Sequence, residues 1–225
     1  MKKIFLIFII FVIQFSSLVS KEPKLEEILS GLERPWSLSF VDNSKILVTE
    51  KQGNFFLADL KNNNLSKINH NLNILVDGQG GLLEVLYSGE NVFVSYSENR
   101  GKGKSSTSVA RASFNKKELK FKNIFRSEPP INSGYHFGSR LVIKDNQLYI
   151  TAGERGEGMI AQDPTKHPGS IIRIHLDGKI PKNNPKFKGK ENWLPEIFQI
   201  GVRNPQGMDL SPFNNKIYLT NHGAK

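Results

Sequence analysis

Residues 139–151 read SRLVIKDNQLYIT, an apolar run followed by a polar turn and a second apolar run that ends in a polar residue. The same pattern occurs as SLSFVDNSKILVTE at 37–50, GLLEVLYSGENVFVSY at 81–96 and GMDLSPFNNKIYLT at 207–220. β-branched and aromatic residues alternate with polar ones around a turn of Asn, Asp, Ser or Gly, which predicts two strands joined by a short turn. A unit that recurs in this way predicts a repeat architecture.

Further strands are predicted between the copies, at 54–60, 108–114 and 170–176. Roughly four strands per repeat is the content of one propeller blade. A β-sandwich also has strands at regular intervals, but its strands need not resemble one another. We therefore predict an all-β fold, a β-propeller, present as an incomplete arc of about three and a half blades.

The first residues have the features of an export signal, with a basic start, an unbroken apolar run at 4–13 and a cleavage sequence at 18–20. Polar residues from Gln14 onward interrupt the apolar run before it reaches the ~20 residues of a membrane span. We predict a signal peptide at 1–20, one partial propeller domain at 21–225 and a periplasmic or secreted location. A retained anchor is the alternative, and no stable membrane span is expected after cleavage.

Composition excludes several classes of site. The chain has no cysteine, which rules out disulfides, thiolate nucleophiles and zinc–thiolate centres. Its formal net charge of +10 is spread over turns such as 61–64 and 181–186, without a basic helix or an aromatic-flanked basic stripe. We therefore expect no nucleic-acid partner. The positive field could still favour an anionic ligand.

Polar residues precede the predicted innermost strands of three repeats, where propeller blades converge on a central channel. They are Gln79 in the second repeat, His136 in the third, and Arg203 with Asn204 in the fourth. A histidine there could act as a general base near neutral pH. An arginine can bind carboxylate or quinone-type oxygens through two donors, and amides both donate and accept. The alternative for His136 is a structural histidine that bonds to a neighbouring blade.

The remaining candidates carry less specific signals. The sequence His222-Gly223-Ala224 follows the last predicted strand, and its carbonyls could bind a hard cation such as calcium, although an ordinary turn has the same composition. The charged loop 154–157 lies near the channel with no role assigned. His167 follows a turn in which Asp163 is typical of backbone capping, so we expect no catalytic role for it. No phosphate loop, zinc-binding spacing or catalytic Ser/His/Asp order occurs.

Five motifs occur in order: GLERPW at 31–36, GQGGLL at 78–83, HFGSRL at 136–141, AQD at 161–163 and GVRNPQG at 201–207. Together they resemble the glucose/sorbosone dehydrogenase family, the soluble aldose sugar dehydrogenases that use pyrroloquinoline quinone (PQQ) and calcium. The resemblance runs from about Gly31 to the last residue. It implies a six-bladed propeller, which agrees with the repeats but is a separate argument.

The resemblance implies a role for each matching residue. His136 would remove the proton from the anomeric hydroxyl of the sugar while a hydride passes to the quinone. Arg203 would bind the quinone oxygens and stabilise charge on the reduced cofactor. Tyr135 stands where glucose-oxidising members have an acidic residue, which leaves the identity of the sugar open.

The same resemblance implies contacts to the cofactor and its metal. Gln79 and Asn204 would contact the cofactor, and the carbonyls of Gly223 and Ala224 would hold calcium. The family usually has proline where Ala224 stands, but only a carbonyl is needed. The basic side chains that hold the cofactor carboxylates come from later blades in the family and have no counterpart here, so we expect a fragment of a longer reading frame that binds cofactor poorly alone.

The sequence thus predicts part of an exported PQQ-dependent oxidoreductase that converts aldose sugars to lactones. Its partners would be the aldose and an electron acceptor that the sequence does not identify. One alternative is a non-catalytic periplasmic β-propeller that serves as a binding module. A calcium-dependent propeller lactonase is a third possibility, but such enzymes place a cluster of Glu, Asp and Asn side chains on the metal, which is not evident here.

Overall fold

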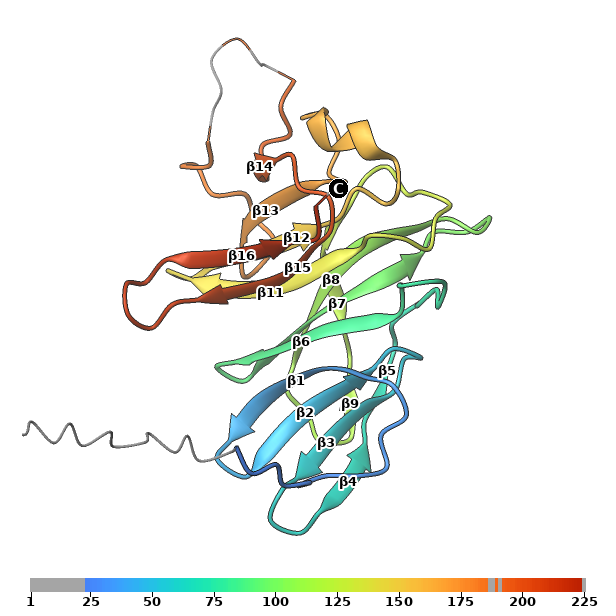
Figure 1. Ribbon diagram of the computed structural model, residues 1–225, viewed down its shortest axis with the longest axis vertical. Coiled ribbons are helices and arrows are strands. Elements are labelled where there is room, and N and C mark those ends of the chain that lie inside the picture. Colours follow the sequence, from blue (N-terminus) through green and yellow to red (C-terminus); the bar gives the residue numbers. More distant parts are fainter. Residues whose placement is uncertain (1–22, 186–188, 190–191, 224–225) are drawn as a thin grey trace, which may run out of the picture.

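The computed structural model describes residues 23–185, 189 and 192–223. The predicted signal peptide and Ala224 lie outside these residues. Three four-stranded antiparallel sheets and one two-stranded sheet follow one another along the chain and form an open arc (Figure 1). The predicted all-β, partial-propeller fold is confirmed. Within the described residues, no helix has the length and apolar character needed to cross a membrane.

Each sheet is a blade whose innermost strand lies toward the centre of the arc. Blade 1 contains β1 (Pro35–Asp42), β2 (Lys45–Glu50), β3 (Phe55–Asp59) and β4 (Asn64–Lys67). Blade 2 contains β6 (Leu82–Ser88), β7 (Asn91–Asn99), β8 (Ser105–Ser113) and β10 (Lys122–Arg126).

Blade 3 contains β11 (Gly138–Lys144), β12 (Gln147–Ala152), β13 (Ser170–His175) and β14 (Ile197–Ile200). The fourth sheet is the pair β15 (Pro205–Leu210) and β16 (Ile217–Asn221). The short strands β5 (Asn69–His70) and β9 (Glu118–Leu119) pair in parallel, and a 3₁₀ helix, η1, spans Gly158–Gln162.

The polar turns of the first three repeats form tight hairpins, with two residues between the strands. Between β11 and β12, Asp145 and Asn146 both have positive φ angles, 50° and 60°. Between β6 and β7, Gly89 and Glu90 have φ angles of 50° and 66°. Two consecutive residues with positive φ are the mark of the hairpin turn whose twist matches that of the flanking strands, which explains the Asp-Asn and Gly-Glu pairs in the sequence.

The hydrophobic core lies between successive blades. Blades 1 and 2 share one cluster that includes Leu47, Phe55 and Val94, and blades 2 and 3 share another that includes Phe93 and Leu148. Strands in the middle of a blade are covered on both faces, and most contain apolar runs, whereas β8 begins with four buried Ser and Thr residues. This packing holds the innermost strands β1, β6, β11 and β15 side by side, with the channel ends of their preceding loops close together.

A hydroxyl side chain on the second strand of each of the first three blades joins that blade to the next. The hydroxyl of Thr49 donates to the carbonyl of Leu83 at 2.6 Å, and that of Ser95 donates to the carbonyl of Ser139 at 2.6 Å. Thr151 repeats this contact with the carbonyl of Pro205 at 3.1 Å. In all three cases the acceptor lies near the start of the innermost strand of the following blade.

The innermost strands share an irregularity at that point. The register of each inner hairpin shifts near its start, between Pro35 and Ser37, Leu82 and Val85, Gly138 and Leu141, and Pro205 and Gly207. Such bulges bend a strand and redirect its side chains, and they are common beside functional sites. Gln79, His136, Arg203 and Asn204 lie just before three of these bulges, whereas Gly223 and Ala224 follow β16.

Candidate active site

His136 lies in the loop before β11, in a backbone conformation that is uncommon for a residue with a side chain. Its φ angle is +49°, in the left-handed region. Its backbone N–H donates to Oε1 of Gln79 at 2.9 Å. Gln79 comes from the equivalent loop of blade 2, so the two predicted site residues are in direct contact.

The imidazole of His136 is held by a carboxylate. Its Nδ1 lies 2.5 Å from Oε1 of Glu154, a residue that is 3% exposed. The other oxygen, Oε2, accepts from the backbone N–H of Gly158 at 3.2 Å. A carboxylate accepts at Nδ1, so in the neutral imidazole this nitrogen carries the proton and Nε2 is the acceptor. Among the described residues, none hydrogen-bonds to Nε2.

Glu154 follows β12, and the sequence alone assigns it no role. A signal is present in the hairpin register: Gly138 pairs with Ala152, and two further residues along each strand bring His136 opposite Glu154. A charged loop after a strand usually lies in solvent, so its composition does not distinguish this buried carboxylate from a surface residue.

Arg203 lies on the other side of Glu154, in the loop before β15. Its Nε is 3.7 Å from Oε1 of Glu154, and its carbonyl accepts from the backbone N–H of Glu154 at 2.8 Å. Its Nη1 donates to Nδ1 of His222 at 3.0 Å. The Arg203 side chain remains 36% exposed, and no described residue accepts from Nη2. The carboxylate of Glu154 thus lies between the predicted base and the predicted cation.

Asn204 is buried at the junction between blade 3 and the fourth sheet. Its Oδ1 accepts from the backbone N–H of Gly138 at 3.2 Å, and its carbonyl accepts from the backbone N–H of His222 at 3.0 Å. The amide oxygen is therefore used within the protein, and only the Nδ2 end is available to a ligand. Gly223 follows His222 at the end of the described residues, and Ala224 lies beyond them.

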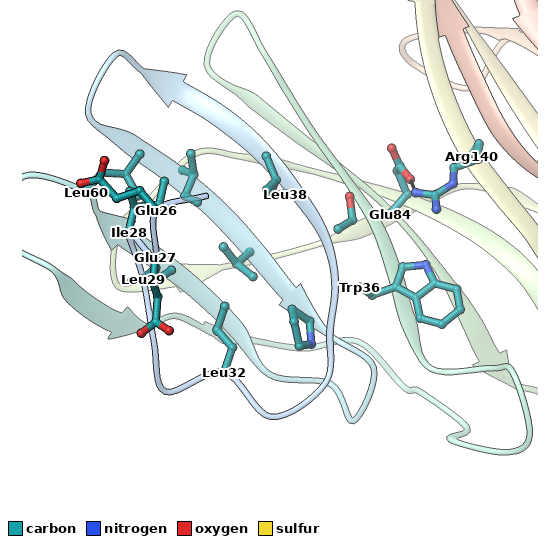
Figure 2. A pocket seen from close by; sticks show the side chains of 14 residues that line it. Glu26, Glu27, Ile28, Leu29, Leu32, Trp36, Leu38, Leu60, Glu84 and Arg140 are labelled. Atoms are coloured by element: carbon teal, nitrogen blue, oxygen red, sulfur yellow. Dashed lines mark hydrogen bonds and ion pairs between the residues drawn. The ribbon is translucent and has the colours of Figure 1, made fainter. Parts of the chain in front are cut away.

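The described residues hold no group of three or more His, Asp and Glu side chains arranged for a metal ion. A separate pocket of about 640 Å³ lies between the segment before β1 and the face of blade 1 that carries Ile46 and Val48 (Figure 2). It is mainly apolar, with an ion pair at one end, and its lining includes Leu29, Leu32, Trp36, Leu38, Glu84 and Arg140. None of the predicted site residues lines it.

Comparison with known proteins identifies the family of this arrangement. The family model described as "Glucose / Sorbosone dehydrogenase" matches residues 32–225. The chain belongs to this family. The predicted resemblance is confirmed over the whole propeller arc.

Individual members of the glucose/sorbosone dehydrogenase family show how much of such a protein the chain represents. It is 32% identical to the aldose sugar dehydrogenase YliI of Escherichia coli (strain K12), covering 89% of this chain and 57% of that protein. It is 27% identical to quinoprotein glucose dehydrogenase B of Acinetobacter calcoaceticus, covering 93% of this chain and 50% of that protein. A crystal structure of a glucose dehydrogenase matches with a TM-score of 0.84 at 34% identity, covering 89% of this chain and 61% of that one. The chain therefore spans between half and two thirds of the length of these relatives.

Proposed function

We propose that the protein is the blade 1 to blade 4 portion of an exported, PQQ-dependent aldose dehydrogenase. The observation that carries this proposal is the His136–Glu154 pair at the channel end of blade 3. Glu154 binds Nδ1 of the imidazole, and no described residue hydrogen-bonds to Nε2. Named relatives support the class, since one is an aldose sugar dehydrogenase and another is a quinoprotein. The signal peptide at 1–20 and a periplasmic or secreted location are parts of the same proposal.

The donors around the site fit the quinone end of PQQ. No described residue accepts from Nη2 of Arg203 or from Nδ2 of Asn204, so both can donate to quinone oxygens. Gln79 has its Oε1 on His136, and its Nε2 can donate to the cofactor or the sugar. The carbonyls of Gly223 and Ala224 would supply oxygen ligands to a calcium ion, the ligand type that this cation prefers.

When bound, PQQ supplies an electrophilic carbon that accepts a hydride. His136 would take up the hydroxyl proton of the aldose at Nε2 while the anomeric C–H hydrogen leaves with its bonding electron pair. The remaining C–O bond becomes the carbonyl of the lactone. Glu154 stabilises the imidazolium that forms and keeps the ring in the correct tautomer. Arg203 places positive charge where negative charge develops on the oxygens of the acceptor.

Reconstitution tests this proposal. The chain, alone and extended by the later blades that its full-length relatives contain, is mixed with PQQ and Ca²⁺, cofactor binding is followed by absorbance, and aldose-dependent reduction of an artificial dye measures turnover. Activity in the extended form that His136→Ala abolishes, with cofactor binding retained, is the expected result. PQQ binding without turnover in the extended form would instead support the non-catalytic binding module, and absence of PQQ binding in both forms would contradict the cofactor assignment.

A further inference from the structure

Arg155, which follows Glu154, has a buried guanidinium directed at the backbone around the proposed base. The residue is 2% exposed. Its Nε donates to the carbonyl of Tyr135 at 2.9 Å, and its Nη2 donates to the carbonyl of Ser133. Its Nη1 donates to the carbonyl of Ser105 at 2.8 Å, and Nη2 also reaches the hydroxyl of Ser105 at 3.0 Å. The fork thus joins the start of β8 to the loop before β11.

Two further contacts of Arg155 reach residues on the other side of the loop. The guanidinium carbon lies 3.7 Å from the centroid of the Phe137 ring, a cation–π arrangement. The backbone N–H of Arg155 bonds to the carbonyl of His136 at 3.4 Å. Arg155 therefore contacts the residue before His136, the residue after it and the carbonyl of His136 itself.

The charge of Arg155 is not matched by an ion pair. Among the described residues, no carboxylate lies within ion-pair distance of its guanidinium. Burial lowers the pKa of Arg155 to about 10, against the opposing influence of Asp77 and Glu154, so the side chain is still protonated at neutral pH. Burying an unpaired charge is costly, and the protein compensates with carbonyl oxygens and an aromatic face. A planar fork with several donors meets several carbonyls at once, which an ammonium group does not.

We propose that Arg155 is a positioning residue for His136. It holds the loop 133–137, so that the His136 backbone keeps its left-handed conformation and the imidazole stays in contact with Glu154. This inference rests on the proposed function, because it assigns His136 the role of base. A strained backbone persists only where its surroundings fix it, and the contacts of Arg155 surround His136 on both sides. Glu154 orients the imidazole ring of His136, and Arg155 holds the backbone of its loop. Two consecutive residues therefore position the proposed base.

The chain offers a matched control in Arg173, a second buried guanidinium. Its Nη2 donates to the carbonyl of Asn183 at 2.6 Å and its Nε to the Oδ1 of Asn184, and it lies 5.0 Å from the centroid of the Phe198 ring. It has the same kinds of contact as Arg155 but touches no residue of the His136 loop. Arg173→Met therefore reports the effect of losing a buried arginine in general.

The test uses NMR on the full chain without cofactor, with Arg155→Met, Arg155→Lys and Arg173→Met. The readouts are the Nδ1–H proton of His136, its exchange rate with solvent, and the backbone ¹³C shifts of His136, which report its φ angle. Both Arg155 variants are expected to raise the exchange rate of Nδ1–H at least about 10-fold and to move the backbone shifts away from left-handed values. Arg173→Met is expected to leave these signals unchanged.

Unchanged His136 signals in either Arg155 variant would overturn the proposal, as would an equal change in Arg173→Met. Thermal unfolding of each variant checks that it folds, and Arg155→Lys keeps the experiment informative if Arg155→Met does not. Because these signals are measured without cofactor, they are independent of PQQ binding. A parallel PQQ titration of the unsubstituted protein tests the proposed function separately.

Discussion

Two histidines of this protein are each bonded to a glutamate, and their surroundings differ. Nδ1 of His136 lies 2.5 Å from Glu154, and the described residues leave its Nε2 unbonded. Nε2 of His167 lies 2.9 Å from Glu196, and its Nδ1 accepts from the backbone N–H of Glu128 at 2.9 Å. The ring of His167 also packs edge-on against Phe125, with 5.2 Å between centroids.

The difference shows what separates a candidate base from a structural histidine. A carboxylate partner is common to both, so the partner alone does not identify the base. His167 has both nitrogens in use, and a histidine in this state holds two segments of the chain together. His136 has one nitrogen available, which is the requirement for taking up a proton.

The largest expected effect comes from substituting each histidine and measuring turnover. His136→Gln should lower kcat/KM of the PQQ- and Ca²⁺-loaded protein by about 10²- to 10⁴-fold, because the general base is lost. His167→Gln should retain most of the activity in protein that remains folded. Equal losses in the two variants would remove the distinction between the two histidines.

The carboxylate partners should differ in the same direction but by less. Glu154→Gln should lower kcat by about 10- to 100-fold, since an amide oxygen still accepts from Nδ1 of His136 but does not stabilise the imidazolium. Glu196→Gln is the matched control, and dye-reduction assays on both variants give the comparison. A Glu154→Gln protein with full activity would show that the carboxylate charge is not used.

Stability should show the reverse order. His167→Ala is expected to destabilise the protein by about 1–3 kcal/mol, because it leaves the backbone N–H of Glu128 and a carboxylate oxygen of Glu196 without their partner. His136→Ala removes one bond at a more open site and should cost less. Urea unfolding of both variants measures the two free energies, and a larger loss for His136→Ala would contradict the structural role of His167.

The smallest expected effect is a pH dependence at Glu196. The hydrogen bond from His167 holds the pKa of Glu196 below its ordinary value of 4.5. A carboxyl whose pKa is lower in the folded state adds stability above its unfolded pKa, and this contribution disappears as the pH falls through the folded pKa. In Glu196→Gln the unfolding free energy should therefore fall less than in the unsubstituted protein as the pH drops below about 4.5. The difference between the two falls should be under about 1 kcal/mol. Glu157→Gln, at an exposed position, is the control, and identical acid profiles for Glu196→Gln and the unsubstituted protein would argue against this pKa shift.

Much of the fold was predictable because the same two-strand pattern recurs four times in the sequence. The inner and middle strands carry long apolar runs with turn residues between them, and all of the predicted strands are present. The outer strands β4, β10 and β14 and the short pair β5 and β9 were missed, because they are brief or partly exposed and have little periodicity to detect.

The candidate site was predictable for residues that occupy the same position in successive repeats. Gln79, His136 and Arg203 occupy corresponding places before innermost strands, and the structure brings them together. Glu154 and Arg155 lie after a second strand, where no such correspondence pointed to them, and their charges resemble those of a solvated loop. Arg155 is buried against the start of β8 in blade 2, and Glu154 lies between His136 and the loop before β15, so their burial depends on contacts that a single segment of sequence does not contain.

The hydroxyl contacts between successive blades give the arc a direction. Thr49, Ser95 and Thr151 each donate to the blade that follows in the chain, so every one of these junctions is made in the same sense, like units of a head-to-tail polymer. Gene duplication can add such a unit without redesigning its neighbours, provided that the new copy retains a donor at this place. A serine or threonine on the second strand therefore marks the order of the blades along the chain.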